Sequence, residues 1–274
     1  MNLLHVLQAF FPHKYVINAK LLGDRRENAW SNLGFWDDQT QNYIQASQQL
    51  ATVLAQSVKL NAKDRLIDLG CGQGASLLLW KNQFHVKAVT AIELQKKLVK
   101  KLHQQGHLSI YQASFLQPQN ILPAHSFDVV LCVDAAYHTN LNDFLAAAHY
   151  LLAENGRVGF HYLLLSDAFF ELSVKQKKAY QYLLKMADVD LNQLMNQQNL
   201  QQQFEKQGFQ DLQLIDLSEQ VFGGFSCYID QQLKMKISSL DMFKIKMTAK
   251  LCQKLNQDGL IHYVQLSAKT IKAH

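Results

Sequence analysis

A glycine-rich stretch, Leu66–Ser76, carries the clearest chemical information in the sequence. It reads Leu-Ile-Asp-Leu-Gly-Cys-Gly-Gln-Gly-Ala-Ser. An apolar run around Asp68 predicts a strand, three glycines at alternate positions predict a tight turn, and the residues that follow are compatible with a helix. Because glycine has no Cβ atom, a ligand can lie directly against such a turn. The stretch therefore predicts a ligand site at the end of a strand.

Two acidic residues near this turn indicate which ligand it holds. Asp68 stands two residues before the first glycine, where its carboxylate could contact a cationic group of the ligand. Glu93 ends the next predicted strand, where it could accept hydrogen bonds from both hydroxyls of a ribose. An exposed acid at the start of a helix is the alternative interpretation of Glu93. A nicotinamide site stays open, because the dinucleotide pattern G-x-G-x-x-G tolerates an alanine at the place of Ala75.

The rest of the chain alternates between strand-like and helix-like runs. The predicted strands cover residues 65–69, 86–92, 108–113, 127–133, 157–165, 209–217 and 260–268. The predicted helices cover residues 75–81, 95–104, 141–152 and 194–207. Apolar, β-branched strands that alternate with helices predict an open α/β sheet with right-handed crossovers. Ligands bind at the carboxyl ends of the strands in such sheets, and the glycine turn lies at such an end.

Three segments do not fit this alternation: residues 1–62, about 167–192 and about 218–258. We expect residues 63–274 to form the main domain, with an N-terminal helical cover segment at 1–62 and two cover insertions after the fifth and sixth strands. Helices beside the strand ends would cover the ligand site. In the last insertion, Phe222-Gly223-Gly224-Phe225 predicts a flexible turn, either a hinge of the cover or a connecting loop.

Charge is concentrated in one part of the chain. The formal net charge is +5, and residues 234–254 alone hold six lysines against one aspartate. The apolar residues of this stretch recur at helical spacing, namely Leu240, Phe243, Met247, Leu251 and Leu255. We interpret the stretch as a cover helix with a solvated lysine face. Peripheral contact with an acidic membrane surface, or with an anionic substrate, is the alternative.

Composition limits the broad class of the protein. No apolar run approaches the ~18 residues of a membrane span, and the N-terminus lacks the features of a signal peptide. The four cysteines have neither the spacing of a metal site nor that of a disulfide framework. We therefore expect a soluble, cytoplasmic protein with reduced thiols, no bound metal and no membrane span. The oligomeric state cannot be predicted from these features.

Four motifs in order resemble those of class I S-adenosylmethionine (SAM)-dependent methyltransferases. The glycine turn resembles the first motif, Ala91–Glu93 the ribose-binding acid, Phe127–His138 the fourth-strand motif, and Leu151–Arg157 the turn before strand five. The resemblance covers about residues 60–165 well and the later strands loosely. It is strongest to small-molecule enzymes of the quinone-biosynthesis and natural-product type.

This resemblance implies a fold, a cofactor and a reaction. The fold would be a Rossmann-like, seven-stranded, mostly parallel sheet with helices on both faces. The cofactor would be S-adenosyl-L-methionine, and the reaction an SN2 methyl transfer to an oxygen or nitrogen, less readily a carbon, of a small acceptor that could be apolar. The alignment of the reacting atoms and the exclusion of water would then supply much of the catalysis.

The resemblance also implies which residues contact the cofactor: Asp68, Gly70, Cys71, Gly72, Gly74, Glu93, Leu94, Ser114, Phe115, Val133 and Asp134. The family usually has an acid after strand three that binds the adenine amino group. Here that stretch is Gln112–Phe115, which contains no acid. Ser114 or a backbone group could replace the acid, and Phe115 could pack on the adenine ring.

On the acceptor side, His138 is the best candidate for a general base. It follows the fourth strand, and a histidine at this place can act as the base in similar O-methyltransferases. Lining the pocket or capping the next helix are the alternatives. The predicted substrate contacts are Tyr15, Trp36, Tyr137 and His161. Trp36 ends Asn32–Trp36, which is similar to a Leu/His-x-Gly-x-Trp segment in the cover of several of these enzymes.

Other function classes fit the sequence less well. Nucleic-acid methyltransferases that modify amino groups usually have an Asp/Asn-Pro-Pro-aromatic motif, but Asp134–Tyr137 contains no proline. Cys132 lacks the preceding proline of a 5-methylcytosine enzyme, and the net charge is modest for RNA binding. We expect a small-molecule acceptor and no nucleic-acid partner. A non-catalytic SAM-binding protein and a nicotinamide oxidoreductase are the remaining alternatives.

Overall fold

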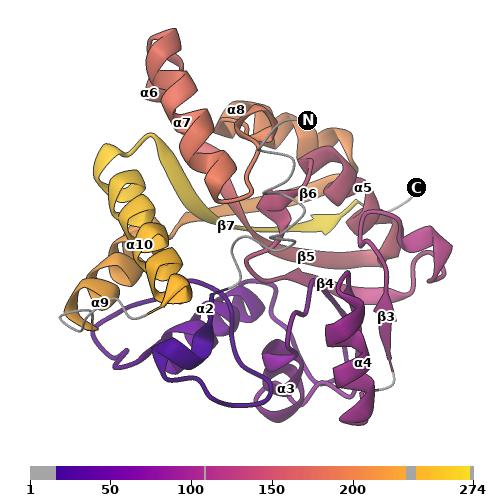
Figure 1. Ribbon diagram of the computed structural model, residues 1–274. Helices are drawn as coiled ribbons and strands as arrows, with labels where there is room; N and C mark the ends of the chain where they lie inside the picture. Colours follow the sequence, from indigo (N-terminus) through magenta and orange to yellow (C-terminus); the bar gives the residue numbers. More distant parts are fainter. Residues whose placement is uncertain (1–16, 108, 233–238, 272–274) are drawn as a thin grey trace, which may run out of the picture.

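The computed structural model describes residues 17–107, 109–232 and 239–271. Within these residues the chain forms one seven-stranded sheet in the order β3-β2-β1-β4-β5-β7-β6 (Figure 1). The strands are β1 (Arg65–Leu69), β2 (Ala88–Glu93), β3 (Ile110–Gln112), β4 (Phe127–Cys132), β5 (Leu152–Leu165), β6 (Phe209–Asp216) and β7 (Ile261–Thr270). β1 to β5 pair in parallel, and β7 is antiparallel to both β5 and β6. The predicted Rossmann-like sheet is thereby confirmed.

Helices flank the sheet and extend beyond its strand ends. They are α2 (Tyr43–Ser57), α3 (Ala75–Asn82), α4 (Lys96–Gln104), α5 (Leu141–Leu151), α6 (Asp167–Phe170), α7 (Val174–Met186), α8 (Gln197–Lys206), α9 (Gly224–Gln232) and α10 (Leu240–Asp258). Short helical turns are η1 (Ala19–Leu22), η2 (Pro118–Asn120), η3 (Ala136–His138), η4 (Leu191–Gln193) and η5 (Glu219–Gly223). In Figure 1, α9 and α10 lie together at the left, and α6 and α7 rise at the top. No helix among the described residues combines the length and apolar character needed to cross a membrane.

The centre of the sheet is apolar, which is expected for parallel strands covered on both faces. Leu66 and Ile67 of β1 and residues 129–132 of β4 are completely buried. On β5, Phe160 stacks on Phe204 of α8 with a distance of 6.0 Å between ring centroids. Close packing of this kind holds the carboxyl ends of the central strands in fixed positions, and the glycine turn follows one of them.

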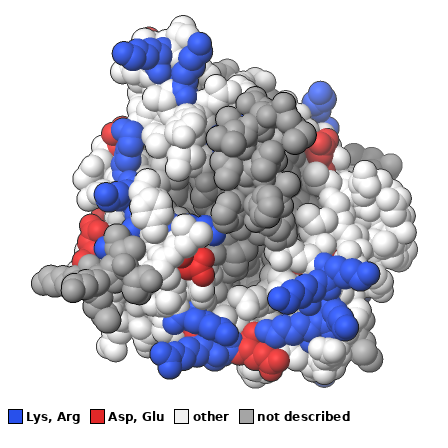
Figure 2. All heavy atoms as spheres, viewed as in Figure 1, with Lys and Arg blue, Asp and Glu red and all other residues white. Residues whose placement is uncertain are grey.

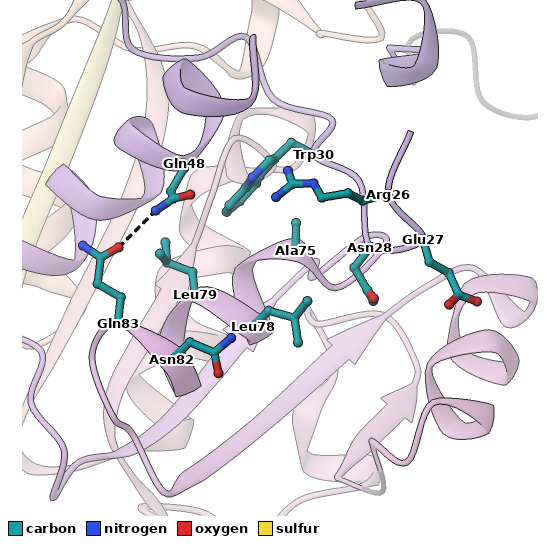
Figure 3. A pocket seen from close by; sticks show the side chains of 10 residues that line it. All are labelled: Arg26, Glu27, Asn28, Trp30, Gln48, Ala75, Leu78, Leu79, Asn82 and Gln83. Atoms are coloured by element: carbon teal, nitrogen blue, oxygen red, sulfur yellow. Dashed lines mark hydrogen bonds between the residues drawn. The ribbon is translucent and has the colours of Figure 1, made fainter. Parts of the chain in front are cut away.

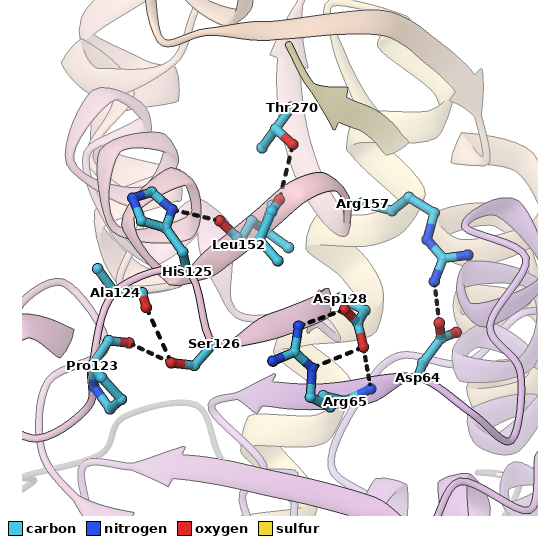
Figure 4. A network of polar contacts seen from close by, with 11 residues as sticks. Asp64, Arg65, Pro123, Ala124, His125, Ser126, Asp128, Leu152, Arg157 and Thr270 are labelled. Atoms are coloured by element: carbon cyan, nitrogen blue, oxygen red, sulfur yellow. Dashed lines mark hydrogen bonds and ion pairs between the residues drawn. The ribbon is translucent and has the colours of Figure 1, made fainter. Parts of the chain in front are cut away.

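Ion pairs join the strands at the opposite edge of the sheet (Figure 4). Arg65, at the start of β1, donates through its backbone N–H and its guanidinium to Asp128 of β4. The hydrogen bonds from Arg65 hold the pKa of Asp128 below its usual value. Arg157 of β5 pairs with Asp64. These charged side chains therefore connect β4 and β5 to the start of β1, away from the predicted site.

Two element boundaries differ from the sequence prediction by three residues or more. β5 begins at Leu152 rather than at residue 157, because Leu152 already pairs with Phe127 before a register shift. The predicted turn at 154–156 is thus an irregularity inside the strand. α8 begins at Gln197 rather than at residue 194, because Met195 forms a bridge with Leu164 of β5 instead of a helical turn.

The segment Phe222–Phe225 is helical, so the prediction of a flexible turn is wrong. η5 runs directly into α9, which begins at Gly224. A Cβ atom on Gly224 would lie 2.3 Å from Cβ of Trp36. Glycine at this position permits the close approach of Trp36 to the helix and does not mark a bend.

The buried face of α10 differs from the face that the sequence predicted to be buried. Its buried residues are Ile245, Ala249, Cys252 and Leu255. Leu240, Phe243 and Met247, which were expected on the buried stripe, are 58%, 49% and 38% exposed. Only the end of the predicted stripe turns inward. Lys234 and Lys236 of the predicted basic segment lie outside the described residues.

Candidate active site

A cavity of about 500 Å³ lies at the carboxyl ends of β1, β2 and β4. One part of its wall is the glycine turn with the residues that follow β2 and β4. The opposite part comes from the cover helices, including Leu184 of α7 and Leu251 of α10. The sequence predicted a ligand site at this edge of the sheet, and the cavity occupies that place.

Glu93 connects the end of β2 to the glycine turn. The backbone N–H of Gly72 donates to Glu93 Oε2 over 3.0 Å, and that of Gln95 donates to Oε1 over 2.8 Å. Glu93 is buried and lines the cavity. Each carboxylate oxygen can accept a second hydrogen bond. Glu93 can therefore accept the two hydroxyls of a ribose in the place that the sequence predicted.

The glycines of the turn have different tasks. Gly70, Cys71 and Gly72 line the cavity, but Gly74 does not. Gly74 has φ +84°, and a Cβ atom there would lie 2.5 Å from Cδ2 of Leu102. It therefore needs to be glycine in order to start α3 against α4. Gly74 was predicted to contact the cofactor, but it lies outside the cavity wall.

Asp68 lies beneath the turn and does not line the cavity. Its Oδ2 accepts a hydrogen bond from Nε1 of Trp80 over 2.7 Å, and its buried Oδ1 has no hydrogen-bond partner among the described residues. Burial raises the pKa of Asp68 to about 6. A buried acceptor without a donor is costly, so this oxygen suits a cationic or donating group. Residues of the glycine turn lie between Asp68 and the cavity, and the contact of Asp68 with the cofactor stays a prediction.

The surfaces for a flat base are apolar. Leu94, which is 64% exposed, and Phe115 both line the cavity, as does Val133. Ser114 is exposed and outside the cavity, and its hydroxyl accepts the backbone N–H of Leu116 over 3.3 Å. Phe115 therefore has the position expected of a residue that packs on an adenine ring. The Ser114 side chain instead forms a hydrogen bond with the backbone two residues later and does not face the cavity.

Asp134, just after β4, gathers polar groups from three parts of the chain. Its Oδ1 accepts the hydroxyls of Tyr137 over 2.7 Å and of Tyr263 over 2.8 Å, and its Oδ2 accepts the N–H of Leu33 over 3.3 Å. Burial raises the pKa of Asp134, although these donors oppose the shift. Its φ of +55° is uncommon for a residue with a side chain. The tyrosines fix this carboxylate at the cavity wall.

His138 also lines the cavity and lies at an exposed position in η3. Its Nδ1 is 3.0 Å from the carbonyl oxygen of Asp188. A carbonyl oxygen only accepts hydrogen bonds, so Nδ1 carries the proton in the neutral ring and Nε2 is the basic nitrogen. This hydrogen bond leaves Nε2 free to accept a proton, and the role of His138 as a general base stays a prediction.

Of the predicted substrate contacts among the described residues, only Tyr137 lines the cavity. Trp36 instead stacks on Tyr228 at 4.2 Å between centroids and donates from Nε1 to the Leu33 carbonyl. Trp36 therefore packs the cover together outside the cavity wall, and its contact with the substrate stays a prediction. Tyr15 lies outside the described residues.

His161 is likewise placed in the core rather than at the cavity. It is completely buried, and its Nδ1 accepts the backbone N–H of Asp134 over 3.2 Å. Burial lowers the pKa of His161 to about 3, so its ring is neutral at physiological pH. His161 therefore supports the backbone of Asp134 from outside the cavity wall, and its contact with the substrate stays a prediction.

The sequence interpretation missed several wall residues, above all Tyr263 of β7. Because β7 is antiparallel to β5, its first residues lie at the same edge as the carboxyl ends of the parallel strands. A tyrosine near the start of the last strand was the available signal. Thr248 and Cys252 of α10 were also missed, because the inward face of that helix was misassigned.

A second pocket lies behind the glycine turn (Figure 3). Its volume is about 360 Å³, and Trp30 and Ala75 line both it and the main cavity. Its one arginine, Arg26, forms an ion pair with the buried Asp24 over 2.8 Å. It contains neither the glycine backbone nor Glu93, so we assign the site to the larger cavity. No group of three metal-ligating side chains occurs among the described residues.

Comparison with known proteins identifies the family. A family model described as a methyltransferase domain matches residues 39–214. This chain belongs to that family. A 27-O-demethylrifamycin SV methyltransferase of Amycolatopsis mediterranei is 29% identical over 113 residues, which are 38% of this chain and 40% of that protein. An erythromycin 3''-O-methyltransferase of Saccharopolyspora erythraea is 26% identical over 140 residues, 47% of this chain and 44% of that protein. The chain thus spans less than half the length of each relative.

Solved methyltransferase structures share the fold. A geranyl diphosphate methyltransferase in complex with GPP and sinefungin has a TM-score of 0.72 at 13% identity, with 97% of this chain and 98% of that chain covered. A structure of such an enzyme with SAM also aligns, with a TM-score of 0.66. The methyltransferase family predicted from the sequence is confirmed, and SAM is the cofactor bound in one of these solved structures of the same fold. The glycine turn, Glu93 and Phe115 are the described residues that fit this cofactor.

Proposed function

We propose that this methyltransferase-family chain transfers the methyl group of SAM to a hydroxyl or amine of a small, uncharged or cationic acceptor with an apolar body. The observation that carries the proposal is the Asp134 carboxylate at the cavity wall, held by Tyr137 and Tyr263. When bound, SAM supplies a sulfonium methyl that is already a strong electrophile. The remaining tasks fall to the chain itself: to orient the acceptor, to exclude water and to remove a proton.

The charge of the cavity supports an acceptor without negative charge. Its described wall contains the acids Glu93, Asp134 and Asp188, and no lysine or arginine. Carboxylates in a partly enclosed cavity favour a positive charge and oppose an anion. A sulfonium and an amine are stabilised in such a site, and a hydroxyl can donate to Asp134. A phosphate or carboxylate on the acceptor would not find a compensating cation in the described wall.

The shape of the cavity supports an apolar acceptor body. Much of the wall on the cover side is apolar, formed by Leu163, Leu184, Val189, Phe222, Leu251 and Leu255. An apolar wall retains an apolar acceptor and excludes water from the methyl position. The volume of about 500 Å³ is shared by cofactor and acceptor. It suits a small molecule or one end of a larger one.

His138 is proposed as the general base when the nucleophile is a hydroxyl. Its Nε2 takes the hydroxyl proton while Nδ1 keeps its own proton on the Asp188 carbonyl. The ring becomes a cation in this step, and the Asp134 carboxylate lies in the same cavity wall. Oxygen as the methylated atom is supported by the two curated relatives, whose names both specify O-methylation at a defined position or an O-demethyl substrate. An amine that is already neutral would need no base.

The proposal is tested by measuring S-adenosylhomocysteine release with three probes that share one carbon skeleton: geraniol, geranylamine and geranyl diphosphate. We expect kcat/KM for the alcohol or the amine to be at least ~10-fold higher than for the diphosphate, because unfavourable interactions with the Asp134 charge cost ~1.4 kcal/mol or more. Preference for the diphosphate would contradict the charge argument.

The role of His138 is tested with whichever of the three probes is turned over. His138→Ala should lower kcat ~10²-fold, and an effect on KM alone would show that His138 is not the base.

A further inference from the structure

The outer face of α10 carries apolar side chains that nothing in the described structure covers. Leu240, Phe243 and Met247 are 58%, 49% and 38% exposed. Their spacing of three and four residues places them on one side of the helix. Apolar residues exposed as a group mark interaction sites more often than scattered ones do.

This apolar stripe leads to the cavity. The next residue at helical spacing is Leu251, which lines the cavity wall together with Thr248 and Leu255 of the same helix. One continuous apolar strip therefore extends along α10 from solvent at its N-terminal end to the acceptor side of the cavity. An apolar acceptor that reaches the cavity along this path would remain in contact with apolar surface.

Lysines flank the stripe. Lys246 and Lys250 lie on α10 and form no ion pair within the described residues. Neighbouring α7 carries four lysines and no acid, and Tyr180 of α7 contacts α10 through Asp258. Figure 2 shows lysine and arginine atoms over both α10 and α7 on one face of the molecule. Basic residues beside an apolar helix face favour a surface that is both apolar and anionic.

We propose that the exposed face of α10 docks on an anionic lipid bilayer. Leu240, Phe243 and Met247 would enter the interface between headgroups and acyl chains, and the flanking lysines would contact anionic headgroups. A second copy of the chain fits the face less well, because it would bring two sets of lysines together. The proposal concerns the outer surface and does not depend on which nucleophile the cavity accepts.

The test is sedimentation of the full chain with vesicles, first of phosphatidylcholine alone and then of phosphatidylcholine mixed with phosphatidylglycerol. We expect ~10-fold stronger binding to the mixed vesicles, since each lysine near an anionic surface contributes several-fold, and a decrease with added salt. The double variant F243E/M247E should bind ~10-fold or more weakly. The variant K246Q/K250Q should lose most of the preference for the anionic vesicles.

Ile271→Glu is the matched control, because Ile271 is 44% exposed and follows the end of β7 that is remote from α10. It should leave vesicle binding unchanged. All variants should keep the wild-type unfolding midpoint and the wild-type affinity for S-adenosylhomocysteine, which shows separately that the fold and cofactor site are intact. Absence of binding to the anionic vesicles at low salt would overturn the proposal. A second outcome would also overturn it: the wild type forms a dimer, F243E/M247E is a monomer, and neither binds lipid. The exposed face of α10 would then bind a second copy of the chain.

Discussion

The hydroxyl of Tyr263 donates to Oδ1 of Asp134 over 2.8 Å and so joins the start of β7 to the end of β4. The same carboxylate oxygen accepts Tyr137 from η3. Two tyrosines that are far apart in the sequence thus hold one carboxylate at the cavity wall. The arrangement fixes the side chain that we propose faces the acceptor.

Tyr263→Phe should lower kcat about 10-fold, since one lost hydrogen bond to a charged group is worth ~1.5–3 kcal/mol. The remaining donors hold Asp134 less firmly, and the pKa of Asp134 should rise further. Tyr162→Phe is the matched control, because the Tyr162 hydroxyl donates to the Gln193 carbonyl over 2.9 Å away from the cavity wall. The control should lose stability of ~1 kcal/mol without a change in kcat. Equal kcat values for both variants would separate Tyr263 from catalysis.

Asp68 and His161 should give the stability of the chain two opposing pH dependences. Between pH 3.8 and about 6, folded Asp68 holds a proton that unfolded Asp68 has released, so its contribution to the free energy of unfolding falls as pH rises. Between about 3 and 6.5, unfolded His161 holds a proton that the folded residue lacks, so its contribution rises with pH. The two contributions largely cancel in the wild type.

Single variants should reveal each contribution. In Asp68→Asn the contribution of His161 remains, so the free energy of unfolding should rise by ~2–3 kcal/mol between pH 3.8 and about 6. In His161→Gln the contribution of Asp68 remains, so the free energy of unfolding should fall by a similar amount over the same range. Urea unfolding at a series of pH values measures both slopes. Slopes of the same sign in the two variants would show that the burial of at least one group is wrongly described.

Gly224→Ala should destabilise the chain, whereas Gly223→Ala should not. A Cβ atom on Gly224 would lie 2.3 Å from Cβ of Trp36, which cannot move without the backbone. At Gly223 the nearest atoms are side-chain ends of Asn256 and Glu219, both at 3.0 Å. We expect a loss of ~1–3 kcal/mol at Gly224 from overpacking, and at Gly223 a change within ~1 kcal/mol, since alanine also improves helix propensity. Thermal unfolding of the two variants compares them directly.

The sequence was sufficient to predict the sheet and the position of the cavity at its strand ends, because both depend on local patterns. The bounds of β1 and the place of Glu93 follow from short apolar runs and their ends. The glycine turn has a conformation that only a few residue types adopt. Such signals lie within a few neighbouring residues, and no knowledge of the packing between elements is needed to interpret them.

The acceptor side could not be predicted in the same way, because it depends on which face of each cover element turns inward. Trp36 was expected at the substrate and instead packs on Tyr228 and Gly224. His161 and the cavity-lining Leu163 are two residues apart on β5 and so share one face of the strand, but His161 is completely buried beside β7. Tyr263 reaches the cavity only because β7 is antiparallel. These contacts join residues far apart in the chain, so periodicity alone does not reveal them.

The central claim is that the glycine turn and Glu93 bind SAM. Calorimetric titration with S-adenosylhomocysteine, SAM and NAD tests it most directly, with Glu93→Ala as the variant and the exposed Glu205→Ala as the control. We predict that both adenosyl ligands bind the wild type and the control, that Glu93→Ala weakens binding by ~1.5–3 kcal/mol, and that NAD does not compete. Binding of NAD without any response to SAM, or an unchanged affinity in Glu93→Ala, would contradict the claim.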